Sequence, residues 1–492
     1  MPLKRIPIVG PANKDLSEFF VTSGGVELLN AVIEFNGTSV AIKTRPGLVY
    51  HRKLPVATGI DGIFYWESKR KVVVVAGGGI YAAGALTDEL VKFSSGTERL
   101  NIGPCQFAAT ANHLYIASTS GRMMRWDGES PAIRVADEVA PVDVSSIATH
   151  NNRMLAVERG TNRVWYTLPV QVDNPTAPLE WSGYFDATRT TDSIQSLMAV
   201  GAEILLMRNK SVEFWYDDGV TPFRPVSGAA VDIGISSPRA VIKQANTVFW
   251  LSSDRHFYAM TGRQPVDLGK GQIDDAIQNI TSISDVIAAA THQFVIFTFT
   301  QASQSWVFDI KNQVWYSWSS LLAGRHKEYR GRHAARMPGG RWLLGGYDGW
   351  TYFMFNGIFK DGESTCQLKH RTPHYDLGSI IQKQSSRVLI KVSKSEVKLW
   401  YKLIELPDAV RCHAYSYTLP DAAKTNYTVS GLPDGFSYDA STKTITSNDE
   451  DKPIGVTNVT INSINEWGAS HTQVVELAIT DFDPEITYEG TE

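Results

Sequence analysis

The chain repeats one pattern of apolar and polar positions. Each copy has a short apolar strand, a polar turn, and a second strand that is rich in aromatic residues. Seven copies begin 39 to 51 residues apart, at 71–84, 112–128, 151–167, 202–219, 246–262, 292–319 and 339–357. This spacing is typical of propeller blades built from four short strands. We therefore predict an all-β fold whose body is a β-propeller of about seven hairpin blades.

The copy at 112–128 shows the physical basis of this prediction. Leu114 and Ile116 mark the first strand, residues 118–121 supply the turn, and the returning strand alternates up to Trp126. Glycine and short polar residues allow positive φ in such turns at little cost. A single hairpin cannot bury both of its faces, so the copies must stack on one another.

Aromatic residues recur on the second strands. They could form a sugar-binding platform, but packing between blades explains them better, because aromatic side chains bury a large apolar area. The six tryptophans of this stripe are Trp126, Trp165, Trp215, Trp250, Trp306 and Trp315.

Helical periodicity is scarce. The spacing of apolar residues predicts one amphipathic helix over 273–287, and a short helix is also expected near 13–20. The repeat stops near Phe359. We expect an N-terminal arm at 1–42, the propeller body at 43–360, basic connecting strands at 361–413 (387–392 and 396–403 among them), and a separate C-terminal domain at 414–492.

The C-terminal segment changes character, with threonine-rich alternating strands. It resembles bacterial Ig-like domains, which suggests a small β-sandwich followed by an acidic tail. The residues that carry this resemblance are Leu432, Pro433, Gly435, Phe436, Asp439, Thr444 and Ile445.

Composition narrows the functional classes. The 492 residues carry 47 basic and 51 acidic side chains, and 43% are hydrophobic, which excludes wholesale disorder. A net charge of −4 argues against a nucleic-acid coat protein. Cys105, Cys366 and Cys412 are far apart, which argues against a disulfide scaffold and a structural zinc site. With no signal peptide and no apolar span of bilayer length, we expect a soluble chain made in a cytoplasm.

Motifs for catalysis are missing from the sequence. The glycines at 77–79 lack the ending of a phosphate loop, and the carboxylate pairs at 217–218 and 274–275 suit turns and a helix start. The histidines show no metal-binding spacing, and no nucleophile elbow occurs. We therefore predict that the chain is not an enzyme and that it has no metal or cofactor.

One basic segment, 325–341, has six cationic side chains against Glu328, a local net charge of +5. It could face a phosphate backbone or an acidic partner surface, and a solvated loop between two blades explains it equally well. Its members, which we treat as candidate partner-binding residues for an adaptor, a spike or DNA, are Arg325, Lys327, Arg330, Arg332, Arg336 and Arg341.

The order of several elements resembles the podovirus tail nozzle family, also called tail hub or packaged-DNA-stabilization proteins. An early Thr44-Arg45-Pro46-Gly47-Leu48 resembles the family's arginine-x-Pro-Gly-hydrophobic element near the N-terminus. The hairpin at 144–166, the stretch with Ser211, Glu213, Phe214 and Trp215, and Trp306–Asp309 with Trp315 resemble later elements. The resemblance spans roughly residues 43–357.

This resemblance implies a structural virion protein that is assembled in the host cytoplasm. Such proteins form a ring, usually a homohexamer, below the portal and adaptor rings, extend the channel for double-stranded DNA, help to retain the packaged genome, and carry tail fibres or tailspikes. The Ig-like segment departs from the family pattern. The alternative is a carbohydrate-binding or glycan-cleaving β-propeller with an Ig-like module.

Overall fold

The computed structural model divides the chain into two compact units, residues 1–85 with 89–395, and residues 396–492 with the short segment 86–88. It describes residues 27–371 apart from short gaps at 37–38, 57, 85–87, 95–97, 172, 175, 220–222, 270–271 and 323. In the C-terminal part it describes 406, 409–410, 414–419, 425–448, 453–465 and 470–480. The helix expected near 13–20 and the strands expected at 387–392 and 396–403 lie outside these residues.

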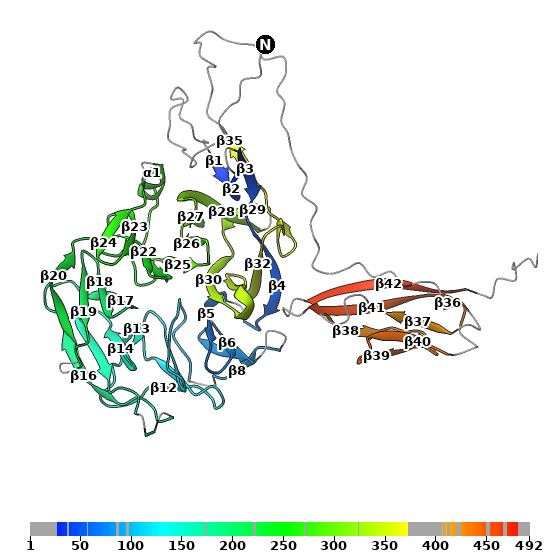
Figure 1. Cartoon of the computed structure of the whole chain (residues 1–492), viewed down its shortest axis with the longest axis horizontal. Coiled ribbons are helices and arrows are strands. Elements are labelled where there is room, and N and C mark those ends of the chain that lie inside the picture. The colour runs from blue at the N-terminus through cyan, green and yellow to red at the C-terminus, as the bar shows by residue number, and fades with distance from the viewer. Residues whose placement is uncertain are drawn as a thin grey trace, which may run out of the picture. The chain divides into compact units, whose positions relative to one another are not determined.

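Seven sheets, each built on four antiparallel core strands, make up the propeller of the first unit, and in the first six the four strands follow one another along the chain (Figure 1). The first three sheets are β5 (Ile60–Trp66), β6 (Lys71–Ala76), β7 (Gly79–Ala83) and β8 (Val91–Lys92); β9 (Gln106–Ala109), β10 (Leu114–Ala117), β11 (Met124–Trp126) and β12 (Ile133–Arg134); and β13 (Val144–His150), β14 (Arg153–Glu158), β15 (Arg163–Thr167) and β16 (Trp181–Asp186). The next two are β17 (Ile194–Val200), β18 (Glu203–Arg208), β19 (Val212–Tyr216) and β20 (Arg224–Val231); and β21 (Val241–Gln244), β22 (Thr247–Leu251), β23 (Phe257–Thr261) and β24 (Gln264–Asp267).

The last two sheets also contain strands from the start and from the end of the propeller sequence. The sixth contains β25 (Val286–Ala290), β26 (Phe294–Phe299), β27 (Gln304–Asp309) and β28 (Val314–Leu322), extended by β1 (Glu27–Leu29) and β35 (Lys369–Arg371), with β29 (Arg325–Glu328) also paired to β28. The seventh contains β30 (Gly331–Arg336), β31 (Trp342–Gly346), β32 (Trp350–Phe355) and β4 (Gly47–Lys53), extended by β33 (Lys360–Asp361) and β34 (Ser364–Thr365). A separate hairpin joins β2 (Ala31–Asn36) to β3 (Ser39–Thr44), and a 3-10 turn covers Pro338–Gly340.

The predicted β-propeller fold is confirmed, because the seven sequence copies coincide with the middle strands of the seven sheets. The copy at 112–128, for example, supplies β10 and β11. In the seventh sheet the outer strand β4 comes from the N-terminal side of the chain and pairs with β32. The segment after Phe359, for which the sequence shows no partner, continues into the propeller, because β33 pairs with β4 and β35 pairs with β1.

Apolar side chains fill the spaces between neighbouring sheets. One buried cluster joins Val73 and Ile80 of the first sheet to Leu114 and Trp126 of the second, and similar clusters lie between the following sheets. This confirms the packing interpretation of the tryptophan stripe, since Trp126, Trp215, Trp250, Trp306 and Trp315 are buried. Trp165 is partly buried and packs against the cluster between the second and third sheets.

The predicted helix over 273–287 is wrong in its second half. The helix α1 covers only Gln272–Gln278, and the strand β25 starts at Val286. Ile273, Ile277 and Ile280 are buried as the periodicity requires, but the chain after the helix must return to the sheet. No helix among the described residues is long and apolar enough to cross a membrane.

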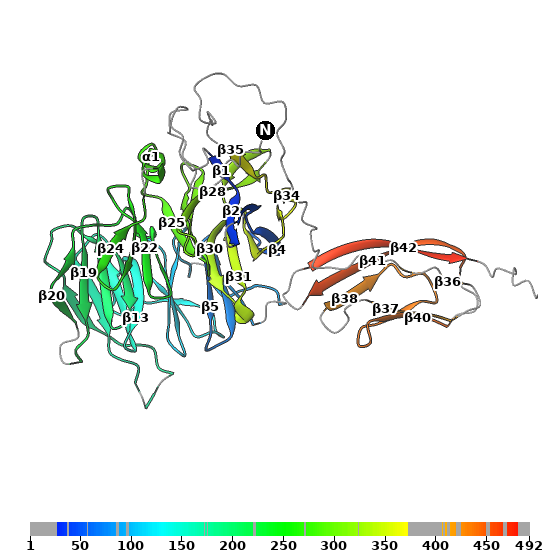
Figure 2. The ribbon, with the colours of Figure 1, turned by 45° about the horizontal axis from the view of Figure 1, so that its top comes forward.

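The second unit consists of two small sheets. One contains β36 (Ala409–Val410), β42 (Ser470–Thr480), β41 (Gly455–Asn465) and β38 (Thr425–Ser430), and the other contains β37 (Tyr415–Thr418), β40 (Thr444–Ser447) and β39 (Ser437–Asp439) (Figure 2). Tyr427, Ile445, Val459 and Leu477 from both sheets share one buried core. This is the β-sandwich expected there, and its Ig-like assignment stays a prediction.

Candidate functional site: a clasp at the chain ends and a basic hairpin

The element Thr44-Arg45-Pro46-Gly47-Leu48 lies where the chain enters the seventh sheet. Leu48 is buried in the core between the sixth and seventh sheets. A Cβ atom on Gly47 would lie 2.5 Å from the carbonyl oxygen of Lys360 and even closer to that of Ile358. Only glycine fits there, because β4 must approach the returning chain closely. The element is therefore part of the closing geometry of the propeller.

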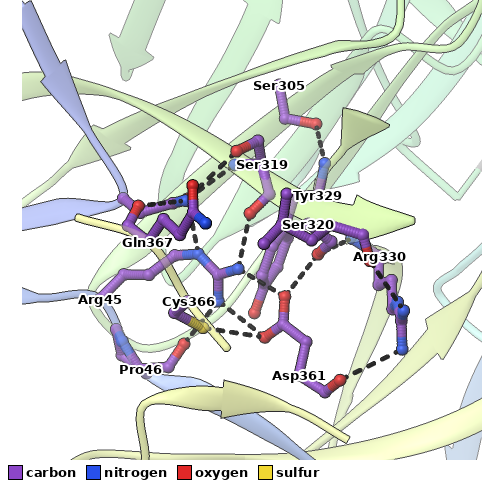
Figure 3. A network of polar contacts seen from close by, with 12 residues as sticks. Arg45, Pro46, Ser305, Ser319, Ser320, Tyr329, Arg330, Asp361, Cys366 and Gln367 are labelled. Carbon is purple, nitrogen blue, oxygen red and sulfur yellow. Dashed lines mark hydrogen bonds and ion pairs between the residues drawn. The ribbon is translucent and has the colours of Figure 1, made fainter. Parts of the chain in front are cut away.

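Arg45 forms a buried clasp with Asp361 (Figure 3). Both are essentially inaccessible, with 0% and 1% exposure. The guanidinium donates from Nη1 to Asp361 Oδ1 at 2.9 Å and from Nη2 to Asp361 Oδ2 at 2.5 Å. This bidentate geometry is the strongest form of an arginine–carboxylate pair. The two residues are 316 positions apart, so the pair ties the start of the propeller to its end.

Further hydrogen bonds satisfy the rest of the Arg45 guanidinium. It donates to the carbonyl oxygens of Ser319, at 2.7 Å, and Pro46, at 3.0 Å, and from Nε to Asn30 Oδ1 at 2.9 Å. Its carbon atom also lies 4.6 Å from the centre of the Tyr329 ring. Segments from the start and from the end of the propeller, and from the sixth sheet, therefore meet at the side chain of Arg45.

The partners of Asp361 complete the network. Ser320 donates its hydroxyl to Asp361 Oδ2 at 2.5 Å, and the Cys366 thiol donates to Oδ1 at 3.4 Å. Burial raises the pKa of Asp361, but Arg45 and these donors together lower it below its usual value. Burial also raises the pKa of the Cys366 thiol, to about 12. The carboxylate is thus held ionised and the thiol protonated.

A second buried ion pair lies within another stretch quoted for the family resemblance. Glu213 is 3% exposed, and its Oε1 lies 3.1 Å from Nε of the fully buried Arg208. Trp215 donates its indole N–H to Glu213 Oε2 at 3.1 Å. Arg208 also donates to Asn162 Oδ1 at 2.8 Å, which reaches back to the third sheet. This charged pair therefore joins neighbouring blades.

Asp309 has the same structural role in the late-blade element. It is fully buried and accepts hydrogen bonds from the backbone N–H groups of Lys311 and Asn312, at 3.0 and 3.1 Å. These bonds fix the turn between β27 and β28. The charged residues Arg45, Glu213 and Asp309 of these three elements thus stabilise the fold, and none of the three is exposed.

The basic segment 325–341 is not a loop, because it contains β29 and β30. Arg330 is only 5% exposed and donates to the Tyr352 hydroxyl at 3.3 Å and to the carbonyl oxygens of Asp361 and Leu321, both at 3.2 Å. Arg332 pairs with the buried Glu328. These two cations serve the interior and offer little to a partner.

The remaining cations of the segment lie in two places. Arg325 and Lys327 are exposed on β29, which forms a hairpin with the end of β28. Arg336 is exposed at the far end of β30, about 17 Å from its start at the usual rise of a strand, and Arg341 follows it half-buried. The structure does not bring the six candidate residues together, and it leaves Arg325 and Lys327 as the exposed pair of a basic hairpin.

The middle of the propeller is crossed by Arg239, which directly precedes the fifth sheet. Its guanidinium donates to the second sheet and its flanking loops, namely the carbonyl oxygens of Pro104 and Ser118, both at 3.2 Å, and Gln106 Oε1 at 3.3 Å. Burial lowers the pKa of Arg239 to about 10. Since the second and fifth sheets are not neighbours, this contact spans the centre of the propeller.

A polar cleft of about 570 Å³ lies between the second and third sheets. Thr110, Asn112, Asn151 and Gln171 line it, together with His150, which is 6% exposed and whose Nε2 has no hydrogen-bond partner. Burial lowers the pKa of His150 and favours the neutral imidazole. No local sequence pattern predicts this cleft, because its residues come from two separate hairpin turns.

Comparison with known proteins identifies one family. Residues 4–356 match the family described as "Bacteriophage P22 Gp10, beta-propeller". No curated protein matches the chain.

Several solved structures are similar to the chain, all of them distantly. The WD40 β-propeller domain of Doa1 is 10% identical and covers 63% of this chain and 97% of its own, with a TM-score of 0.42. A streptogramin B lyase is 9% identical, with coverages of 63% and 98% and a TM-score of 0.44. The extracellular domain of the one-component system BT4673 from B. thetaiotaomicron is 10% identical, with coverages of 94% and 64% and a TM-score of 0.46. Similarities this distant carry no functional argument.

Proposed function

The chain belongs to the bacteriophage P22 Gp10 β-propeller family, and from this premise we propose that it is a subunit of the tail nozzle of a short-tailed phage. Family membership makes it a structural component of the virion. In the proposed role several copies form a ring, as a homohexamer, below the portal and adaptor. The ring extends the DNA channel, helps to retain the packaged genome and carries fibres or tailspikes. We propose no enzymatic activity.

The observation that carries the proposal is the extent of the family match, which covers nearly the whole propeller. The match ends at residue 356, one residue after β32 completes the seventh sheet. The buried pairs of Arg45 with Asp361 and of Arg208 with Glu213 lie in or beside the elements that resemble the family. A conduit must hold its shape while DNA moves through it, and clasps between distant strands suit that requirement.

The net charge of the chain and the contact of Arg239 across the propeller both bear on the path of DNA. Arg239 crosses the middle of a single propeller, so a duplex has to pass between copies. Each phosphate that a protein neutralises adds affinity and slows movement. A net charge of −4 per chain therefore suits a wall that DNA slides past. Ring formation multiplies this weak repulsion without creating strong contacts.

We place the contact with an adaptor or spike at the basic hairpin, because Arg325 and Lys327 are its exposed cations. Charge reversal by Arg325→Glu and Lys327→Glu should leave folding intact and weaken association with an acidic partner surface by about tenfold or more. Arg330 is unsuitable for this test, since its loss would disturb the interior.

The experiment measures binding of the double variant to the portal–adaptor complex and to the purified spike. Reversal of two exposed lysines elsewhere, Lys92→Glu and Lys311→Glu, is the matched control. Equal binding by wild type, variant and control would refute the assigned contact, while the nozzle proposal would still stand if rings bind the adaptor.

Glycan binding is the second candidate, favoured by the polar cleft between the second and third sheets. Amide, hydroxyl and imidazole groups recognise sugar hydroxyls by hydrogen bonds. Titration of the chain with host surface oligosaccharides tests it. Saturable binding that Asn151→Ala and Gln171→Ala abolish would support a glycan-binding role.

A further inference from the structure

Three side chains that can bind metals converge on the fifth sheet. His256 directly precedes β23, Asp267 ends β24, and Asp274 lies in α1. Nδ1 of His256 lies 3.6 Å from Asp267 Oδ2 and 3.5 Å from Asp274 Oδ1. All three ligand atoms lie within 4.8 Å of one another, and this is the one such group found among the described residues.

The imidazole nitrogen Nδ1 of His256 lies between the two carboxylates. Nδ1 of His256 is inaccessible to solvent, yet it has no hydrogen-bond partner within the described structure. Buried polar atoms without a partner are rare and call for an explanation, such as an ion that the atom binds. Metal–ligand bonds of about 2.0–2.2 Å at tetrahedral angles place ligand atoms about 3.4 Å apart. The two distances from His256 are close to this value.

The surrounding structure holds the carboxylates in place. Gly269 donates its N–H to Asp267 Oδ1 at 2.7 Å, which leaves Oδ2 directed toward His256. A Cβ atom on Gly269 would overlap with Asp274 Oδ1, so the missing side chain makes room for that carboxylate. The group is therefore arranged before an ion binds, which lowers the cost of binding.

Arg255 fixes the histidine relative to the helix. Its Nη1 donates to the carbonyl oxygens of Ile277, at 2.9 Å, and Ile280, at 2.5 Å, at the end of α1. The turn that carries His256 is thereby tied to the helix that carries Asp274. The same bonds keep the distance between these two ligands constant.

We propose that His256, Asp267 and Asp274 bind one divalent transition-metal ion. Two carboxylates and a neutral imidazole supply two negative charges and a mixed oxygen and nitrogen set, which suits Zn²⁺ or Mn²⁺ better than Ca²⁺. The three side chains are 34%, 44% and 17% exposed, so water can occupy the remaining positions. The ion would join α1 to the hairpin β23–β24. This proposal does not depend on the proposed function.

Calorimetric titration of the metal-free, tag-free full-length chain with ZnCl₂ and with MnCl₂ tests the site. We expect one ion per chain and an upward shift of the melting temperature at saturation. His256→Gln and Asp267→Asn should each weaken binding by about tenfold or more, since each removes a ligand. Asp267 is the most exposed of the three, so its variant should fold even if the histidine variant does not.

Asp254→Asn is the matched control, because it removes a neighbouring negative charge that is not a ligand. Unchanged binding in this control together with loss in the ligand variants supports a specific site. Absence of binding to the wild type, or equal weakening by Asp254→Asn, would overturn the proposal and leave only a histidine flanked by two aspartates.

Discussion

The buried clasp between Arg45 and Asp361 should contribute far more to stability than any exposed ion pair of the chain. Replacing Arg45 by methionine leaves the Asp361 carboxylate buried without its cation and deprives the carbonyl oxygens of Pro46 and Ser319 of a donor. Breaking a buried pair in this way costs about 3–5 kcal/mol. The expected loss is therefore a large fraction of the stability of a typical domain.

The matched control is the pair of Lys43 and Glu34, whose side chains are 59% and 56% exposed. Lys43→Met should cost no more than about 1 kcal/mol, because solvent screens an exposed pair. The double variant Arg45→Met with Asp361→Leu should recover part of the loss, since no unpaired charge remains buried.

Urea unfolding of the full-length chain, followed by tryptophan fluorescence, measures these differences. With a slope near 2 kcal/mol per molar urea, Arg45→Met should lower the midpoint by about 1.5–2.5 M, and Lys43→Met by about 0.5 M or less. Equal shifts of the midpoint in both variants would refute the claim that the pair of Arg45 and Asp361 stabilises the junction between the start and the end of the propeller.

Three further predictions concern single positions. Gly47→Ala should destabilise the chain by about 1–3 kcal/mol in the same assay, because its Cβ would overlap with the backbone of Ile358 and Lys360. In the control Gly357→Ala the new Cβ meets no atom within 4 Å, so only the positive φ should cost stability, about 1 kcal/mol. Glu213→Gln should lower the free energy of unfolding by about 1–3 kcal/mol, since Arg208 would lose its buried counterion. Unchanged stability would contradict this. Burial and nearby arginines lower the pKa of His333 to about 3. Between pH 6.5 and 3 the folded chain therefore binds fewer protons than the unfolded chain. The stability that His333 contributes is lost as the pH falls through this range, by at most about 1.4 kcal/mol per pH unit. Burial raises the pKa of Asp61 to about 6, which changes stability with pH in the opposite direction. The test is therefore the difference in free energy of unfolding between wild type and His333→Gln. This difference should shrink as the pH falls, and a constant difference would refute the assignment.

The seven hairpins could be predicted because their determinants are local. Alternating apolar positions, turn residues and aromatic strands lie within each stretch of about 15 residues, as in β10 and β11. The outer strand of the seventh sheet could not be predicted, since β4 pairs with β32 about 300 residues away. The end of α1 was also missed, because the pattern of isoleucines continues past the point where the chain turns into β25.

The positions of the charged residues in the candidate site likewise depend on contacts between distant parts of the chain. The run of basic residues at 325–341 is compatible with a partner-binding surface or a solvated loop, and both would expose its cations. Arg330 nevertheless lies inside, because its acceptors on Asp361 and Leu321 and its partner Tyr352 come from other strands. Arg45 belongs to a recognisable sequence motif, but no local pattern around Asp361 indicates that the two residues pair. The group around His256 was missed for the same reason, since its ligands follow no motif spacing.

The proposal that this chain forms the nozzle ring of a phage tail is tested most directly by electron microscopy of the purified full-length protein, alone and mixed with the portal–adaptor complex. The account predicts rings of several copies, six in the proposed homohexamer, that attach coaxially to the adaptor and leave an open central channel. A chain that stays monomeric at high concentration and does not attach to the adaptor would contradict it.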